Sequence, residues 1–381
     1  MASPTSQARL LLSPRFSVEA STPPANLQPT QLPFIAEVKS RLRSGEYRLE
    51  HSPCPCGERE GAVISEVERY GLPLTSVVCV ACGTVRFDPY LDGPSLEDFY
   101  KSFYQNMYGR ATDLESYFLR QRSYGEKILA AFEDSLAPGA WVFEVGCGSG
   151  GALEVFQAKG YRVAGCDYSA ELIDAGRRRG VENIHHGSHT DLHAALGDVK
   201  ADLIYLHHVF EHVIDPLAFL EECRDLLKPG GQVLIVVPDV SRIGSFAYPA
   251  GDLLQFLHIS HKYNYSPEGM RALGERAGYA VTGLRPDPNI QTPCSHMPEL
   301  WVSMSVSEAA AARAGAPASL GREGGSKMLK YLRRTEKLRS LGLCEAQLRS
   351  KTAGVRNYLS TNLARLGRVT PAKVVRKLKG S

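Results

Sequence analysis

A short apolar run that breaks into alternating glycines constrains the fold of this chain more than any other feature. The segment runs from Val142 to Gly151, and a helical pattern follows from Ala152 to Ala158. This order predicts a strand, a tight turn and a helix N-terminus, and residues without a Cβ let the backbone come close to a ligand. Asp167 ends the next apolar run, where a carboxylate can accept hydrogen bonds from two ribose hydroxyls. The sequence therefore predicts a nucleoside-cofactor site.

Further along the chain, the sequence again alternates between strand and helix patterns. Residues 202–206 form another buried-strand run, and HHVFEHV follows it. Asp215 can cap a helix that Pro216 begins, because proline suits the first helical position. That helix ends at the KPGG turn, residues 228–231, and residues 232–237 predict one more strand. The alternation of strands and helices favours a parallel sheet.

These motifs together resemble the class I S-adenosylmethionine-dependent methyltransferases. The glycine motif, the acid after the second strand, FEHVIDP and LLKPGG stand in that family's order, over roughly residues 110 to 306. Several motifs in one order are far more specific than any one alone. The resemblance implies an α/β fold with a Rossmann-like seven-stranded core, in which Leu300 to Val306 supplies an antiparallel seventh strand.

The resemblance also implies a cofactor site. Glu144, Gly146, Gly148 and Gly150 would surround the methionine part of S-adenosylmethionine, Asp167 would hold the ribose, and Tyr168 would lie against the adenine. The residue that holds the adenine amino group is expected near residues 187–189. That segment departs from the family's acidic pattern, so its identity stays open.

Composition and length set the frame around this core. With 381 residues, 43% hydrophobic and 22% charged, the chain has the make-up of a folded protein of two or three domains. We expect a flexible arm over 1–33, a zinc-binding module over 34–100, the methyltransferase domain over 101–306, and a linker with a basic helical tail over 307–381. No apolar run is long enough for a membrane span and no secretory signal is evident, so we expect a cytoplasmic protein.

Two cysteine pairs predict a zinc site. Cys54 and Cys56 form one turn, Cys79 and Cys82 another, and a glycine follows each pair. Four thiolates at such spacing suit a tetrahedral structural zinc, with His51 as an alternative to Cys54. The region looks similar to the N-terminal zinc module of some methyltransferases that act on sugars. The other interpretation is four buried cysteines without a metal.

A second group of polar residues is expected beside the methyl group. His208, Glu211 and His212 are spaced so that they share one face of a helical turn, and His261 follows later in the chain. They look like the site of metal-assisted O-methyltransferases, with His208 in place of a glutamate, and would hold a second divalent ion. Two alternatives stay open: His212 or His261 acts as a metal-free base, or Glu211 and His212 only order the loop. Tyr100, Tyr104, Tyr108 and Tyr117 precede the core domain. We expect their rings to pack against other aromatics, and the alternative is that they form a lid over the site.

The charge of the chain is strongly asymmetric. Residues 321–381 contain 16 Lys and Arg against three Glu. Apolar residues recur among these charges at helical spacing, first over 328–341 and then over 348–366. Such helices can dock on the acidic remainder of the chain, on a partner protein, on a membrane surface or on nucleic acid. We expect docking first, membrane association second and nucleic acid last, because the tail lacks a motif of stacking aromatics.

The sequence thus predicts an S-adenosylmethionine-dependent methyltransferase. The cysteine module favours a sugar, nucleotide-sugar or polysaccharide precursor as acceptor, and Glu211 with His212 favours a hydroxyl oxygen. The alternatives are C-methylation of a sugar or another carbon acid, RNA 2′-O-methylation, and a non-catalytic cofactor-binding scaffold.

Overall fold

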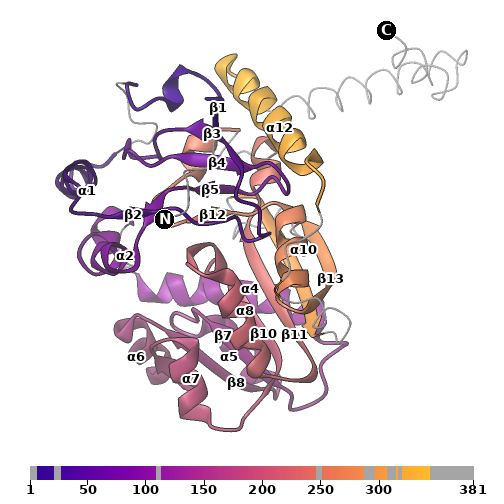
Figure 1. Cartoon of the computed structure of the whole chain (residues 1–381). Helices are drawn as coiled ribbons and strands as arrows, with labels where there is room; N and C mark the ends of the chain where they lie inside the picture. Colours follow the sequence, from indigo (N-terminus) through magenta and orange to yellow (C-terminus); the bar gives the residue numbers. More distant parts are fainter. Residues whose placement is uncertain are drawn as a thin grey trace, which may run out of the picture.

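The computed structural model of this chain contains two main sheets, joined into the body that Figure 1 shows. It describes residues 7–20, 27–108, 113–245, 251–286, 297–306, 315 and 320–343. The second apolar stripe of the tail, 348–366, and the side chain of Tyr108 lie outside these residues.

A seven-stranded sheet forms the core, in the order β13-β14-β11-β10-β7-β8-β9. All its neighbouring strands run parallel except at β14, which is antiparallel to both β11 and β13. The expected seven-stranded α/β core with its antiparallel strand is confirmed. The strands are β7 (Trp141–Val145), β8 (Arg162–Asp167), β9 (Ile184–His186), β10 (Ala201–His207), β11 (Leu227–Pro238), β13 (Tyr279–Pro286) and β14 (Glu299–Val306).

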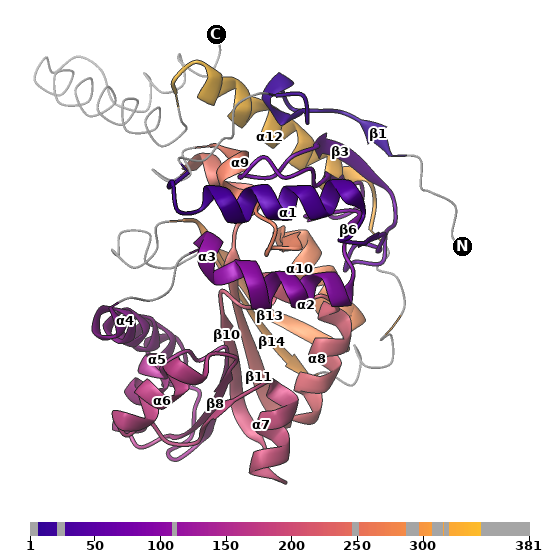
Figure 2. The same cartoon turned by 90° about the vertical axis from the view of Figure 1, so that its left-hand side faces the viewer.

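Helices cover both faces of this sheet, as Figure 2 shows from its edge. One face packs against α4 (Leu114–Phe132), α5 (Gly151–Ala158) and α6 (Ala170–Arg178). The other packs against α7 (His189–Leu196), α8 (Pro216–Asp225) and α10 (Pro267–Arg276). The Asp215 side chain accepts hydrogen bonds from the N–H groups of Leu217 and Ala218. The predicted helix start at Pro216 is therefore present, and α8 follows the segment that carries Glu211 and His212.

A second sheet of five strands lies beside this core, in the order β1-β3-β4-β5-β12. Its strands come from distant parts of the sequence: β1 (Ala8–Arg9), β3 (Gly61–Ser65), β4 (Ser76–Cys79), β5 (Val85–Phe87) and β12 (Tyr263–Asn264). The strand β12 begins two residues after His261 and pairs antiparallel with β5. The module that carries the cysteines is thus tied to the segment that carries a predicted catalytic histidine.

Helices and a two-stranded ribbon pack around the five-stranded sheet. We call this sheet and the elements packed around it the second unit. The ribbon pairs β2 (Leu49–Glu50) with β6 (Tyr90–Leu91). The helices are α1 (Leu32–Ser44), α2 (Gly93–Phe99), the π-helix η2 (Tyr100–Tyr104), α3 (Gln105–Tyr108), the 3₁₀ segment η4 (Val240–Ser245) and α9 (Leu253–Phe256). Their apolar side chains share one core with β3, β4 and β5.

The arm expected over 1–33 is ordered where it is described. Residues 8–9 form β1 beside β3, and the 3₁₀ helix η1 (Pro14–Phe16) places Phe16 in the core, with 0% of its surface exposed. Burying an aromatic ring of this size contributes roughly 2–3 kcal/mol, and the N–H groups of Leu10 and Leu12 also donate hydrogen bonds to carbonyls of β3. For residues 7–20 the expectation of a flexible arm is wrong, because sparse apolar residues suffice when one of them reaches a core.

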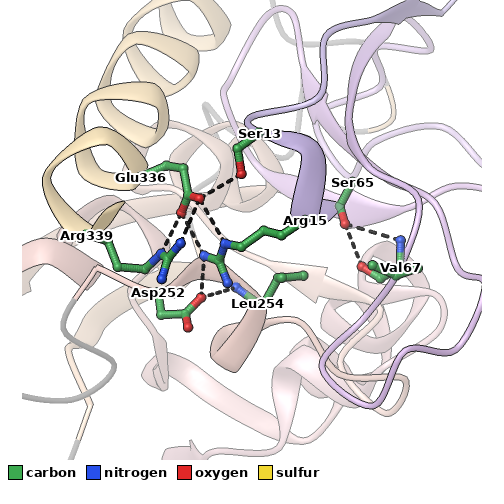
Figure 3. Close-up of polar contacts among 8 residues, drawn as sticks. All are labelled: Ser13, Arg15, Ser65, Val67, Asp252, Leu254, Glu336 and Arg339. Atoms are coloured by element: carbon green, nitrogen blue, oxygen red, sulfur yellow. Dashed lines mark hydrogen bonds and ion pairs between the residues drawn. The ribbon is translucent and has the colours of Figure 1, made fainter. Parts of the chain in front are cut away.

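The first tail helix, α12 (Glu323–Ser340), docks on the second unit along β4 (Figure 1). Gly325 lies against the backbone of Val80, and Met328 and Leu332 are buried in the shared core. Figure 3 shows the polar end of this contact, where Arg15 donates hydrogen bonds to both Glu336 and Asp252. Among the described residues, no helix has the length and apolar character to cross a membrane.

Candidate functional site

The loop between β7 and α5 has a backbone that favours glycine. Gly146, Gly148 and Gly150 have φ values of 76°, 54° and 73°, all in the left-handed region that strains other residues. A Cβ on Gly146 would lie 2.3 Å from Cγ2 of Val209, and one on Gly148 would lie 2.6 Å from the Tyr117 hydroxyl oxygen. Both conformation and crowding therefore require glycine at these positions.

Asp167, at the end of β8, is tied to this loop. One carboxylate oxygen accepts the Gly148 N–H at 2.9 Å and the other accepts the Ser169 N–H at 2.8 Å. Burial raises the pKa of Asp167, and the two amide donors oppose that shift. Each oxygen keeps a further lone pair for a ribose hydroxyl, so the residue fits its predicted role. The next residue, Tyr168, is 79% exposed, with its ring free to meet a ligand.

Glu144 is almost fully buried in β7. The Tyr205 hydroxyl donates a hydrogen bond to its carboxylate at 2.8 Å, and burial raises the pKa of Glu144 to about 8. The side chain is therefore held inside the sheet by β10, next to the glycine loop. The sequence did not predict Tyr205 as its partner, because the pairing comes from the parallel register of β7 and β10.

Gln121 of α4 is a loop-holding residue that sequence reasoning missed. Its amide nitrogen donates to the Cys147 carbonyl at 2.8 Å, and its amide oxygen accepts from the Ser149 hydroxyl at 2.7 Å. One side chain thus fixes both sides of the glycine loop. No local motif marks this role, since Gln121 lies within α4, 26 positions before Cys147.

The four cysteines lie together and are buried. Their ligand atoms all lie within 4.8 Å of one another, with Sγ–Sγ distances of 3.5 Å for Cys54–Cys82 and 3.6 Å for Cys56–Cys79. A tetrahedral zinc with Zn–S bonds of about 2.3 Å separates its sulfurs by roughly 3.8 Å. Hydrogen bonds from the other three thiols hold the pKa of Cys79 well below its usual value. The group therefore fits zinc.

His51 takes no part in this cluster. Its Nδ1 lies 2.8 Å from the Asp88 carboxylate, so His51 is not the replacement for Cys54 that the sequence left open. The same carboxylate accepts a hydrogen bond from Arg86, whose side chain is fully buried. Although burial opposes it, the charges of Cys54, Asp88 and Cys79 raise the pKa of Arg86, which keeps this side chain a cation beside the cysteines. It would offset the negative charge of a four-thiolate zinc site.

Glu211, His212 and His261 meet at the edge of the core where the parallel strands end. Their ligand atoms lie within 4.8 Å of one another, although His261 comes from the segment before β12. The rings of His212 and His261 are perpendicular, with centroids 4.6 Å apart. The sequence predicted this set, and the structure brings its three members together.

The electrostatics of this cluster suit a bound cation. Both carboxylate oxygens of Glu211 are buried and have no hydrogen-bond partner among the described residues. Burial lowers the pKa of both His212 and His261, so each imidazole is neutral and has a lone pair to offer. Two neutral imidazoles and one carboxylate are ligands that divalent metals accept. The residues present therefore fit the second ion that the sequence predicts.

His208 lies elsewhere than the helical spacing predicted. The helical turn η3 (Phe210–His212) begins two residues after it, and His208 itself has a left-handed φ of 55°. Its Nδ1 is 3.5 Å from Glu211, and its Nε2 is 3.1 Å from Glu299 at the start of β14. Although burial opposes it, the two carboxylates raise the pKa of His208 to about 10. The prediction that His208 shares one helical face with Glu211 and His212 is wrong, because the chain does not pass directly from β10 into a helix.

A further group gathers around Glu299. His207, His208 and Glu299 also have ligand atoms within 4.8 Å of one another. The ring of Tyr124 lies over His207, with centroids 3.7 Å apart. Glu299 was not predicted from the sequence, since it is the first residue of β14 and belongs to no recognisable motif. The antiparallel direction of β14 places its first residue at the edge where the parallel strands end.

Tyr100 also reaches the site. Its hydroxyl lies 3.1 Å from Nδ1 of His212 and donates to the carbonyl of Ser260 at 3.3 Å. The sequence predicted aromatic packing for this tyrosine, with a lid over the site as the alternative, and its ring does pack against Phe99 and Tyr104. The second unit therefore contributes a polar group to the cluster in the core.

Comparison with known proteins agrees with this geometry. Residues 118–284 match the family described as "Methyltransferase domain". The ubiquinone biosynthesis O-methyltransferase of Haemophilus ducreyi is 34% identical over 105 residues, which is 26% of this chain and 44% of that protein. The corresponding protein of Xylella fastidiosa is 36% identical over 104 residues, 26% of this chain and 41% of that protein. The chain thus spans less than half the length of these two curated relatives.

Solved structures are similar at lower identity. A methyltransferase of Aquifex aeolicus dependent on S-adenosylmethionine has 19% identity and a TM-score of 0.35, covering 48% of this chain and 89% of that one. A glycopeptide N-methyltransferase in complex with S-adenosylmethionine has 14% identity and a TM-score of 0.38, covering 49% and 94%. Because these scores are low, the assignment of the fold rests on the strand order and on the family match.

Proposed function

We propose, from the premise that this chain carries an S-adenosylmethionine-dependent methyltransferase domain, that the enzyme methylates a hydroxyl oxygen on a sugar, nucleotide-sugar or polysaccharide precursor. In this proposal Glu211, His212 and His261 hold a divalent ion beside the acceptor. Glu144, Gly146, Gly148, Gly150, Asp167 and Tyr168 bind the cofactor. Cys54, Cys56, Cys79 and Cys82 hold a structural zinc with no part in the chemistry.

The observation that carries the proposal is the state of Glu211. Its carboxylate is 1% exposed, and neither oxygen has a hydrogen-bond partner among the described residues. Leaving a buried charge without a compensating partner costs several kcal/mol. His208 offsets part of that cost at 3.5 Å, a long distance for a hydrogen bond. A cation held between Glu211 and the two neutral imidazoles would remove the rest.

The chemistry asks little of the protein beyond position and proton removal. The acceptor oxygen forms a bond to the methyl carbon as the carbon–sulfur bond breaks, and the electron pair of that bond stays on sulfur in S-adenosylhomocysteine. Holding the two reactants in line supplies much of the rate. A divalent ion at this cluster would lower the pKa of the acceptor hydroxyl, so that its proton passes to water. His212 and His261 keep their own positions through contacts with the second unit.

The acceptor class rests on the second unit. A cysteine module lies beside the site and supplies Tyr100 and the strand that follows His261. This region looks similar to the zinc modules of methyltransferases that act on sugars, which favours a saccharide acceptor. The free buried cysteines of the cluster fit a reducing compartment, and we keep the cytoplasm as the proposed location.

A second candidate is transfer without a metal, to oxygen or to an acidic carbon of a sugar. The depressed pKa of His212, caused mainly by burial, favours it, because a neutral imidazole can take the acceptor's proton. The Tyr100 hydroxyl beside Nδ1 would then orient the ring.

The test is methyl transfer from labelled S-adenosylmethionine to a panel of nucleotide sugars, with and without EDTA. The proposal predicts activity that EDTA removes and Mg²⁺ or Mn²⁺ restores, and a loss of about 100-fold or more in Glu211→Gln. Glu275→Gln on α10, an exposed position, is the matched control and should keep full activity. Full activity in EDTA would move the assignment to the metal-free base, and the bond formed in the product would decide between oxygen and carbon.

A further inference from the structure

The antiparallel strand β14 brings one fully buried carboxylate, Glu299, to the edge of the sheet where β10 ends. In β14, Glu299 is paired with Pro238 and Trp301 with Val236, while Val236 is paired with His207 on its other side. These registers fix Glu299 beside the two histidines. Glu299 is 0% exposed, so burying it requires partners.

Glu299 has such partners on both oxygens. The Trp301 indole N–H donates to one oxygen at 3.2 Å, and His208 Nε2 donates to the other at 3.1 Å. His207 Nε2 is farther from Glu299, at 3.6 Å, and has no hydrogen-bond partner among the described residues. Glu299 is therefore a hydrogen-bonded carboxylate, whereas Glu211 is not. Glu299 is thus a carboxylate that holds other side chains, whereas the carboxylate of Glu211 is available to a ligand.

His208 connects the two carboxylates. Its Nε2 faces Glu299 and its Nδ1 faces Glu211 at 3.5 Å. Its left-handed φ of 55° is a conformation that a non-glycine residue keeps only where its surroundings hold it. The ring thus spans the space between β14 and η3, and both of its nitrogens point at a carboxylate.

We propose that Trp301, Glu299 and His208 form a positioning chain that holds the Glu211 carboxylate in place for its ion, with His208 outside the ligand set. This inference rests on the proposed function, which assigns Glu211 to the ion. None of the three residues is catalytic in this account. Partners of a metal ligand typically change metal affinity 10- to 100-fold when they are removed.

The first measurement is Mn²⁺ binding to the full-length protein by titration calorimetry. Glu299→Gln is expected to raise the Kd roughly 10- to 100-fold at unchanged stoichiometry, and His208→Ala to do the same. The double variant, Glu299→Gln with His208→Ala, should bind Mn²⁺ no more weakly than His208→Ala alone. Both substitutions interrupt the same chain of contacts, so the second one adds no further loss. Equal Kd values for Glu299→Gln and the wild type, or additive effects in the double variant, would overturn the proposal.

Two further variants place the ion. Loss of Mn²⁺ binding in His207→Ala, with binding kept in Glu211→Gln, would put the ion among His207, His208 and Glu299 and would overturn the chain.

Should Glu299→Gln fail to fold, Trp301→Phe takes its place, since it removes only the indole donor. Trp141→Phe is its matched control, at the partly exposed start of β7, and should leave the Kd unchanged.

A second readout needs no metal. The chain has only two tryptophans, so its indole N–H groups give two resonances in a ¹⁵N–¹H NMR spectrum, and Trp141→Phe assigns them. His208→Ala should shift the Trp301 resonance in the metal-free protein, and an unmoved resonance would overturn the chain. A wild-type protein that binds no Mn²⁺ would instead contradict the metal-assisted function, whatever the indole resonance shows.

Discussion

The hydroxyl oxygen of Tyr100 lies 3.1 Å from Nδ1 of His212, although 112 positions separate the two residues. The same hydroxyl donates its proton to the Ser260 carbonyl. With the hydroxyl proton directed at Ser260, the Tyr100 oxygen accepts the Nδ1–H of His212, and a lone pair stays on Nε2. We infer that the second unit favours this tautomer, which a metal ligand or a base at Nε2 needs.

Tyr100→Phe tests this relationship. It removes one hydroxyl and leaves the ring packing, so kcat is expected to fall roughly 10- to 100-fold while the Kd for S-adenosylmethionine stays unchanged. Tyr161→Phe is the matched control, since that ring packs against Phe156 at the far end of the sheet. Unchanged kcat in Tyr100→Phe would show that the hydroxyl does not act through His212.

Cys79→Ser tests the zinc site. Removing one of four thiolates should reduce the bound zinc by one ion per chain and destabilise the second unit by several kcal/mol, because a structural zinc contributes directly to folding. Metal analysis and thermal unfolding measure both effects. Cys223→Ser, a buried cysteine of α8, should lose some stability but keep its zinc. Unchanged zinc content in Cys79→Ser would refute the assignment.

Glu144 predicts a pH dependence of stability. Burial raises its pKa from 4.5 to about 8 in the folded protein, so the folded state keeps a proton that the unfolded chain has released. The free energy of unfolding should therefore decline between pH 4.5 and about 8, by at most about 1.4 kcal/mol per pH unit. Glu144→Gln lacks this dependence, so its stability relative to the wild type should increase with pH. Urea unfolding of the cofactor-free proteins at pH 6 and pH 9 measures it, and a pH-independent difference would contradict the account.

Glu336 tests how α12 is held. Its side chain is 6% exposed and accepts hydrogen bonds from Ser13, Arg15 and Arg339 (Figure 3). Despite the opposing effect of burial, these partners lower its pKa to about 2, so its contribution is present above pH 4.5 and is lost as the pH falls through 2. Glu336→Ala should cost roughly 1–3 kcal/mol and expose α12 to proteases. Glu323→Ala, at an exposed ion pair, should cost less than about 1 kcal/mol.

Much of the core could be predicted from the sequence, because its signals are local. The glycine loop, Asp167 and the helix start at Pro216 each depend on residues within one strand–helix unit. The strand that ends at Val306 was predicted from the resemblance to the methyltransferase family. The cluster of Glu211, His212 and His261 was also predicted. Glu211 and His212 follow a parallel strand at the edge of the sheet, and His261 was included because of the resemblance to metal-assisted O-methyltransferases.

The parts that were not predicted depend on contacts between distant segments. Phe16, several residues over 240–259 and α12 join a core whose other buried members lie over 35–107, and β12 pairs with β5. No local pattern indicates where each of these segments docks. Glu299 reaches His208 only because β14 runs antiparallel. The error at His208 has a local cause, since helical spacing says nothing about a residue that leaves its strand with a left-handed φ.

The most direct test of the central claim is native mass spectrometry of the full-length protein with S-adenosylmethionine and Mn²⁺, before and after EDTA. The account predicts one cofactor, one zinc that EDTA leaves in place, and one further divalent ion that EDTA removes and that Glu211→Gln does not bind. A wild-type protein that binds no cofactor would contradict the methyltransferase assignment. One that binds the cofactor without the second ion would contradict metal-assisted transfer.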